Sequence, residues 1–546
     1  MKKYTIGIDF GTLSARALIA DAENGNVLPF VASFDYPHGV MTELCAKTLP
    51  SGYALQHPRD YIDALDALIP QLLENNSIEG EQIAGIGIDF TACTVLPLGS
   101  DGTPLCFEQE FEDEPHAYAK LWKHTGAQKY SERIESIAKE YGDMIKISGG
   151  ILSSEFMIPK IYETFTEARE VYDSTFRFVN AGDYIASELT GNTIHSMSYA
   201  TIKEHYDNAF GKGFPPREFY AKIDPLFADM PEKLGTDLTP VGISCGTLTK
   251  KWADRLGLCT HTAIATPIID AHGAFGAAGI EDGRVIAALG TSAVIAVLSK
   301  NKRYVPAIHS HGYEATAPGL MTFEAGIRAM GDLYSWFVKR CLPKEYFEAA
   351  KENGMGIHAY LRSLAQKLKI GENGLIALDW WNGNRSVIPD DELSGMIVGL
   401  RLSTRPEEIY RALIEASAFE LRRVCENYEE HGLSIKSVVA TGGIAAKDPM
   451  FMQILADVLK KDVEVLSSSE ATALGSAVFG AAAAGLYPSV AEASAKMKQP
   501  IARTYTPTCE DSKAYDKLYE RYVRLYDYFG KTDDVMKFLY NFKNKN

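Results

Sequence analysis

Short apolar runs and amphipathic helical segments alternate along the chain. The runs at 5–8, 83–88, 285–289 and 437–441 are short, mostly aliphatic and followed by turn residues, a pattern typical of buried strands. Residues 59–74 instead place apolar side chains three and four positions apart, which is the spacing of an amphipathic helix. This alternation of strands and helices predicts an α/β fold.

The first strand leads into a turn whose residues suit phosphate binding. Asp9 ends the strand, Gly11, Thr12 and Ser14 form the turn, and Arg16 stands in the strand that follows. Glycine lets backbone N–H groups approach an anion, and hydroxyl and guanidinium groups complete its hydrogen bonds. The carboxylate could hold the Mg²⁺ that accompanies a polyphosphate. Taken alone, the segment can also be read as an edge hairpin with a polar turn.

A second copy of this pattern occurs in the second half of the chain. Gly290 and Thr291 match Gly11 and Thr12 at an offset of 279 positions, about half of the 546 residues. We therefore expect two related halves whose phosphate loops face each other across a central cleft. The second copy has no acid and no arginine at the corresponding places, so the first hairpin is expected to carry most of the metal and charge handling.

Length, charge and cysteine content limit the number of domains, the kinds of partner and the cellular compartment that we expect for this chain. A chain of 546 residues is too long for one hydrophobic core, and we expect two large domains, residues 1–280 and 281–546. The net charge of −16 disfavours nucleic-acid and anionic-membrane partners, because both favour basic surfaces. The eight cysteines show no zinc-site spacing. The charged start is followed by an apolar segment that Gly7, Asp9 and Gly11 interrupt, so we expect no signal peptide, and the longest apolar runs, near 286–298 and 471–487, are shorter than the ~20 residues of a membrane helix. We expect a cytoplasmic protein with reduced thiols.

Three further segments carry candidate chemistry. Asp270 begins a helix rich in glycine and alanine, which implies close packing against another backbone, and it precedes the second hairpin, so its carboxylate could reach the cleft. A helix cap is the alternative role for this acid. Gly442 and Gly443 follow a strand and would leave room for a flat nucleobase. Glu324 lies at an expected break in an aromatic helix, and Lys203 lies in a polar loop, where a sugar hydroxyl could find a charged partner.

Two other features have both a structural and a functional reading. Asp89 ends a strand that resembles the first one, at the edge where α/β sheets place their ligands, although turn and cap residues show the same pattern. The tyrosines of residues 515–529 repeat on one face of a helix. That stripe indicates either core packing or the interface of a homodimer.

Six ordered motifs give the chain a resemblance to a known family. They are GIDFGTLSAR, GIGIDFTACT, IDAHGAFGAAG, ALGTS, TGGIAAKDPMFMQILAD and ATALGSAVFGAAAAG. Together they resemble the FGGY carbohydrate kinases, whose two ribonuclease-H-like domains, of the actin-like ATPase superfamily, enclose a central cleft. The resemblance implies transfer of the γ-phosphoryl group of ATP to a sugar hydroxyl, with Mg²⁺ as cofactor. Lys447 departs from the asparagine that many relatives have in the fifth motif.

The resemblance also implies roles for individual residues. Asp270 falls on the catalytic base, which takes the proton of the hydroxyl, and Asp9 falls on the acid near Mg²⁺. The other matched positions are expected to bind ATP: Gly11, Thr12, Ser14 and Arg16 in the first phosphate loop, Gly290 and Thr291 in the second, and Gly442, Gly443 and Lys447 around the adenosine.

The acceptor sugar is inferred from residues 115–123. Glycerol kinases and xylulokinases of the family usually carry a Trp-x-Asp-x-Arg type segment there, whereas this segment resembles the ribulokinase branch. The resemblance implies phosphorylation of L-ribulose, a step of arabinose catabolism, in a ribulose pocket lined by Ala92, Lys203, Asp270 and Glu324. Other pentulose or polyol acceptors, such as D-ribulose, ribitol or xylulose, stay open. An actin-like ATPase without a small acceptor also fits the two phosphate loops.

Overall fold

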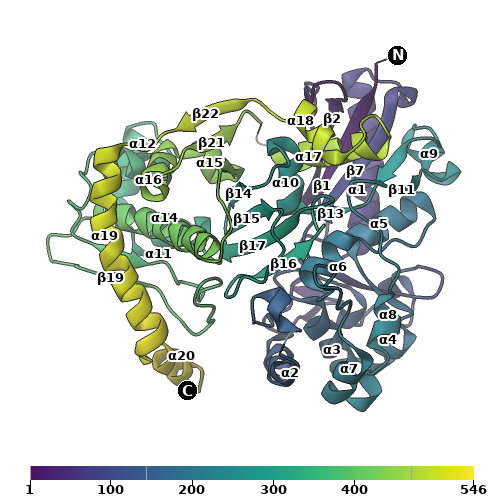
Figure 1. The fold of residues 1–546 in the computed structure, drawn as a ribbon, viewed down its shortest axis with the longest axis horizontal. Coiled ribbons are helices and arrows are strands. Elements are labelled where there is room, and N and C mark those ends of the chain that lie inside the picture. The colour runs from purple at the N-terminus through teal and green to yellow at the C-terminus, as the bar shows by residue number, and fades with distance from the viewer. Residues whose placement is uncertain (1, 143, 469, 546) are drawn as a thin grey trace.

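The computed structural model describes residues 2–142, 144–468 and 470–545, which form two α/β halves (Figure 1). The sheet of the first half has the strand order β11-β12-β7-β1-β2-β3, with β13 paired to β7. Its strands are β1 (Tyr4–Phe10), β2 (Ser14–Asp21), β3 (Ala32–Asp35), β7 (Ile83–Phe90), β11 (Ser244–Thr247), β12 (Ala263–Ala265) and β13 (Ile268–Ile269). Its helices are α1 (Pro58–Asn76), α5 (Ala181–Thr190), α6 (Met197–Lys203), α9 (Lys250–Leu256) and α10 (Asp270–Ala278).

The second half repeats the central arrangement of the first. Its sheet has the order β16-β17-β15-β14-β20-β21-β22. In each half an antiparallel hairpin, β1–β2 or β14–β15, pairs in parallel with the next central strand, β7 or β20. The strands are β14 (Arg284–Leu289), β15 (Ala293–Ser299), β16 (Ser310–Tyr313), β17 (Met321–Ile327), β20 (Ser437–Thr441), β21 (Val463–Leu466) and β22 (Ile501–Tyr505). The predicted α/β class is confirmed.

Helices cover the second sheet, and a smaller region extends the first half. The helices of the second half are α11 (Gly331–Cys341), α12 (Lys344–Glu352), α13 (Ile357–Ala365), α14 (Pro406–Glu430), α15 (Gly442–Lys447), α16 (Pro449–Leu459), α17 (Ala471–Ala483), α18 (Val490–Met497), α19 (Cys509–Asp527) and α20 (Val535–Lys545). The smaller region, at the lower right of Figure 1, contains α2 (Gln128–Glu140), α3 (Met157–Glu167), α4 (Arg169–Ser174), α7 (Arg217–Ile223) and α8 (Met230–Leu234). A short sheet in the order β10-β8-β9-β6 accompanies them: β6 (Leu55–Gln56), β8 (Val95–Leu98), β9 (Ala119–Lys120) and β10 (Arg177–Asn180).

Two helices rich in glycine and alanine join the halves. Helix α10 of the first half packs on α17, which also lies against β1 and β7, as its yellow ribbon beside the first sheet shows (Figure 1). A Cβ atom added at Gly7 would lie 1.7 Å from the carbonyl oxygen of Ala473, and one added at Gly475 would lie 1.8 Å from that of Gly273. These backbones therefore meet where no side chain fits, as the composition of the segment after Asp270 predicts.

Of two predictions about local structure, one is wrong, and the structure decides between the two alternatives of the other. Phe323–Gly326 do not break a helix, because they belong to strand β17, which is buried throughout. Large apolar residues alternate with period two in this segment, which favours a strand over a helix. The aromatic helix α11 starts only at Gly331. The stripe Tyr515, Tyr519, Tyr522 and Tyr526 on α19 is buried in the core of the second half, so it packs the core. The homodimer stays a prediction, and this stripe does not form its interface.

The division of the chain at residues 280/281 also stays a prediction. The strands of the first sheet end at Ile269 and those of the second begin at Arg284. Helix α17 nevertheless shares an apolar core with residues of both halves, among them Leu18, Ala274 and Ile286. Among the described residues, none of the helices combines the length and apolarity that crossing a bilayer requires.

Candidate active site

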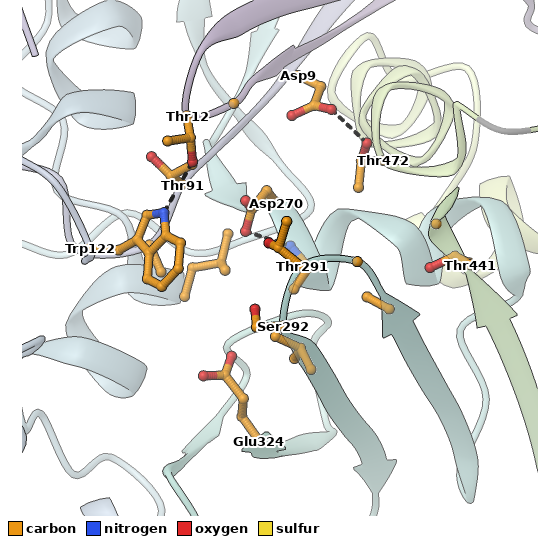
Figure 2. A pocket seen from close by; sticks show the side chains of 18 of the residues that line it. Asp9, Thr12, Thr91, Trp122, Asp270, Thr291, Ser292, Glu324, Thr441 and Thr472 are labelled. Atoms are coloured by element: carbon orange, nitrogen blue, oxygen red, sulfur yellow. Dashed lines mark hydrogen bonds between the residues drawn. The ribbon is translucent and has the colours of Figure 1, made fainter. Parts of the chain in front are cut away.

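A cleft of about 380 Å³ lies between the two halves (Figure 2). The carboxyl ends of β1, β7 and β13 form one wall, and the β14–β15 hairpin, β17 and β20 form the other. Figure 2 shows side chains that line the cleft. Asp270 lies near their middle, with Asp9 above it and Glu324 below it in this view. The cleft brings together most of the predicted site residues: Asp9, Gly11, Thr12, Ala92, Lys203, Asp270, Gly290, Thr291, Glu324 and Gly442.

Four predicted ATP-binding residues do not line this cleft: Ser14, Arg16, Gly443 and Lys447. Arg16 stands opposite Asp9 in the β1–β2 register, but its half-exposed side chain extends to Glu470, at 3.3 Å. Gly443 and Lys447 are exposed on α15. Their roles, like those of the residues inside the cleft, stay predictions.

The first hairpin turn is held from two sides. The backbone N–H of Gly11 donates to the carbonyl of Ser14 at 3.0 Å and closes the turn. The indole Nε1 of Trp122 donates to Oγ1 of Thr12 at 3.1 Å, and Gln56 donates to the Thr12 carbonyl at 2.8 Å. Trp122 also lines the cleft. Its contact with Thr12 was not predicted from the sequence, because the two residues are 110 positions apart.

The second hairpin turn is anchored to the start of α11. The N–H of Gly290 donates to the carbonyl of Ser292 at 2.9 Å. The carbonyls of Gly290 and Thr291 accept hydrogen bonds from Gly331 and Met330, at 3.0 and 2.8 Å. A turn fixed in this way keeps a constant geometry, which a binding site for a polyphosphate requires.

Three acids gather at the centre of the site: Asp89, which is buried, and Asp9 and Asp270, which are partly buried. Asp9 and Asp89 stand opposite each other in the parallel β1–β7 pair, and hydroxyls of α17 bind both: Thr472 donates to Asp9 at 2.8 Å, and Ser476 donates to Asp89 at 2.6 Å. Burial and then the charge of Asp9 raise the pKa of Asp89 well above its usual value and that of Asp270 to about 7. Burial also raises the pKa of Asp9 itself. Three such carboxyls favour a nearby positive charge.

Asp89 does not have the role of a turn or cap residue. Its side chain is completely buried and faces the other acids. The signal in the sequence is the tetrapeptide Gly-Ile-Asp-Phe, which occurs at residues 7–10 and again at 87–90. The two copies pair in register, so their acids meet.

Glu324 links the two halves at the other end of the cleft. Lys203, at the end of α6, donates to its Oε1 at 2.8 Å, and Nε2 of His272, on α10, lies 3.0 Å from its Oε2. Burial alone would raise the pKa of Glu324, but Lys203 and His272 lower it well below its usual value. The carboxylate is therefore ionised, and it stands ready to accept hydrogen bonds from hydroxyl groups.

Lys160 holds two segments that contribute residues to the cleft. Its completely buried Nζ donates to the carbonyls of Cys93 and Leu121, at 2.8 and 2.6 Å. Cys93 has a positive φ of 55°, and Leu121 directly precedes Trp122. Burial lowers the pKa of Lys160 to about 8. One ammonium group thus fixes both the loop that carries Ala92 and the segment that carries Trp122.

Models of two protein domains match the sequence. The model described as "FGGY family of carbohydrate kinases, N-terminal domain" matches residues 4–276, and the corresponding C-terminal model matches residues 285–484. A protein named "Ribulokinase" from Geobacillus thermodenitrificans is 39% identical over 99% of this chain and 97% of its own length. A "Ribulokinase" from Bacillus licheniformis is 40% identical over 97% of this chain and 98% of its own.

Solved structures share the fold. The gluconate kinase from Lactobacillus acidophilus has a TM-score of 0.81 at 19% identity, and the match covers 97% of this chain and 99% of that one. A ligand-bound xylulose kinase from the same organism has a TM-score of 0.79 at 20% identity, with the same coverage. These matches confirm the predicted fold of two ribonuclease-H-like, actin-like ATPase domains around a cleft. Since the two domain models together cover more than four-fifths of the sequence, the chain belongs to the FGGY family of carbohydrate kinases.

Proposed function

We propose that this chain transfers the γ-phosphoryl group of ATP to a terminal hydroxyl of ribulose, with L-ribulose as the preferred acceptor and L-ribulose 5-phosphate as product. One observation carries the proposal: a single cleft contains Asp270, the two hairpin turns with Thr12 and Thr291, and the charged pair Lys203–Glu324. The relatives named "Ribulokinase", which match nearly the whole chain, support ribulose as the sugar.

The chemistry follows from the positions of these groups. The turns with Thr12 and Thr291 would hold the phosphates, and Gly442 would lie beside the nucleoside. Asp270 would accept the proton of the acceptor hydroxyl while the new oxygen–phosphorus bond forms and the bond from the γ-phosphorus to ADP breaks. Lys203 and Glu324 would orient the remaining oxygens of the sugar, so that the reacting hydroxyl points at phosphorus.

The acids of the cleft fit a magnesium ion that arrives with ATP. Among the described residues no group of three or more His, Cys, Asp and Glu side chains could hold a metal ion by itself. Mg²⁺ bound to a nucleotide takes most of its ligands from phosphates and water, so one or two carboxylates suffice. We propose that Asp9 faces this ion, which supplies neutralisation of phosphate charge.

We also infer that the enzyme acts in the cytoplasm. All eight cysteines are free, and four of them are buried, as is usual for proteins of a reducing compartment. ATP, the proposed phosphoryl donor, would be available there.

An assay of ADP release against a panel of acceptors tests the function. The panel contains L-ribulose, D-ribulose, ribitol, D-xylulose, L-xylulose, glycerol and gluconate. We expect L-ribulose to give the highest kcat/KM. A clear preference for xylulose or glycerol would refute the ribulose assignment, and ATP hydrolysis that no acceptor stimulates would favour an ATPase without a small acceptor.

The variant Asp270→Asn tests the base. We expect kcat to fall by about two orders of magnitude or more, while ATP binding, measured by calorimetry, changes little. Turnover close to that of the unchanged protein would remove Asp270 from its proposed role.

A further inference from the structure

Arg385 and Glu155 line the cleft, although neither stands out in the sequence. Arg385 belongs to the second half, and Glu155 lies just before α3 in the first. Their side chains form an ion pair that joins the halves, with only 10% and 14% of their surfaces exposed. The cleft therefore has a second pair of opposite charges across the two halves, besides Lys203–Glu324.

His309 connects this second pair with the first. Nε2 of His309 stands between the two acids, 3.9 Å from Glu324 and 3.7 Å from Glu155. The charge of Glu324 contributes to the raised pKa of Asp270. Burial raises the pKa of Glu155, but Arg385 and His309 are the largest opposing influences and bring it to about 2. The contacts thus run from His272, two residues after Asp270, to Glu324, and from there through His309 to the pair Glu155–Arg385.

The position of Arg385 is fixed by strand β17. A Cβ atom added at Gly326 would lie 3.2 Å from Cδ of Arg385, so the arginine stem rests on this glycine, two residues after Glu324. Ser386 holds the segment in place, since its hydroxyl accepts from the N–H of Gly326 at 2.9 Å and donates to its carbonyl at 3.1 Å. Within the described ranges the guanidinium makes one hydrogen bond, to Glu155. A guanidinium carries five N–H donors. Nε of Arg385 is buried, so the donors that remain for a ligand are those of Nη1 and the second one of Nη2.

The charges at this end of the cleft favour a neutral acceptor. Two cations, Lys203 and Arg385, already face two carboxylates, Glu324 and Glu155. A sugar acid would add a negative charge, and among the described residues that line the cleft no unpaired Lys or Arg lies opposite it. Hydroxyl and carbonyl oxygens, in contrast, can accept hydrogen bonds from a guanidinium without disturbing this balance.

We propose that Arg385, oriented by Glu155, binds the oxygens at the end of the acceptor farthest from the transferred phosphoryl group, and so selects an uncharged five-carbon chain. This inference rests on the proposed function, because it takes the acceptor to be a pentulose phosphorylated at C5. Arg385 then contacts O1, the hydroxyl oxygen that 1-deoxy-L-ribulose lacks. Glu155 acts as a positioning residue that holds the guanidinium.

A comparison of two acceptors with two forms of the protein tests the proposal. The acceptors are L-ribulose and 1-deoxy-L-ribulose, which lacks only the hydroxyl at C1. With the unchanged protein we expect the deoxy sugar to lose about tenfold or more in kcat/KM. Arg385→Gln should lower kcat/KM for L-ribulose by a similar factor, cause little further loss with the deoxy sugar, and leave the KM for ATP within about twofold.

Arg328→Gln is the matched control. Arg328 also belongs to the second half and pairs with an acid, Asp391, but it does not line the cleft. It should affect both acceptors equally. If Arg385→Gln lowers kcat/KM by the same factor for both acceptors, Arg385 does not bind the far end and the inference is refuted, while the proposed function stands.

One further outcome calls for a second variant, and two others refute the inference or a part of it. If circular dichroism shows that Arg385→Gln is unfolded, Arg385→Lys, which keeps a cation opposite Glu155, takes its place in the same comparison. If the unchanged protein phosphorylates no pentulose, the proposed function fails first, and this inference fails with it. Gluconate turnover equal to that of L-ribulose would refute the selection of an uncharged acceptor alone.

Discussion

The contact between α10 and α17 predicts a large effect of a single methyl group. In Gly475→Ala the new Cβ atom would lie 1.8 Å from the carbonyl oxygen of Gly273, and real contacts of this kind stay above 3.0 Å. The helices must therefore separate by about 1.2 Å, because the neighbour is backbone and cannot rotate away. Alanine favours a helix over glycine by about 1 kcal/mol, whereas overpacking costs about 1–3 kcal/mol. We place this clash at or above the upper end of that range, with a net loss of about 2 kcal/mol.

The same displacement should move Asp270, the proposed catalytic base, and so lower the rate of the reaction. Asp270 begins α10, three residues before Gly273, and a misplacement of about 1 Å can cost roughly a hundredfold in rate. We expect Gly475→Ala to lower the urea midpoint of unfolding and to lower kcat by about 10–100-fold.

The control is Gly356→Ala, at the start of α13, where no atom lies within 4 Å of the added Cβ. It should change the stability by less than about 1 kcal/mol and leave kcat unchanged. A Gly475→Ala protein that is as stable and as active as the parent would refute the reasoning.

Three further predictions concern the site. Burial and the charge of Asp9 raise the pKa of Asp270 to about 7, and only its ionised form accepts a proton. Initial rates should therefore show kcat/KM for the acceptor falling as the pH drops through about 7, and a flat profile would contradict this. Lys160→Met leaves two buried carbonyls without their donor, at about 1–3 kcal/mol each. Urea unfolding should shift to lower concentrations and the acceptor KM should rise; an unchanged unfolding curve would argue against this support. Glu324→Gln removes the acidic partner of a buried lysine and should raise the acceptor KM about tenfold with the ATP KM unchanged; equal changes in both constants would count against an acceptor site here.

Contacts between residues of one short segment could be predicted from the sequence. The turn at Gly11 closes on a neighbour three residues away, and the strand predicted at 437–441 has those bounds in β20. Asp448 caps α16 through the N–H of Phe451, as its place before a proline suggests. Short-range geometry of this kind depends on residue type alone.

Contacts between distant segments were not readable in the same way. Glu155 and Arg385 are 230 positions apart, and neither belongs to a motif that suggests a partner. Arg16 shows the opposite failure: it lies in a suggestive motif, but its long side chain reaches Glu470 of the other half. For such residues the direction of a side chain depends on how the two halves pack.

The path of α17 has a consequence for how this chain is made. The glycines of β1 and β7 have their packing partner in a helix near the far end of the chain. While the ribosome is still translating the second half, the first sheet lacks the helix that covers it. The first half therefore cannot complete its packing by itself, and synthesis of α17 becomes the step after which both halves can reach their native packing together.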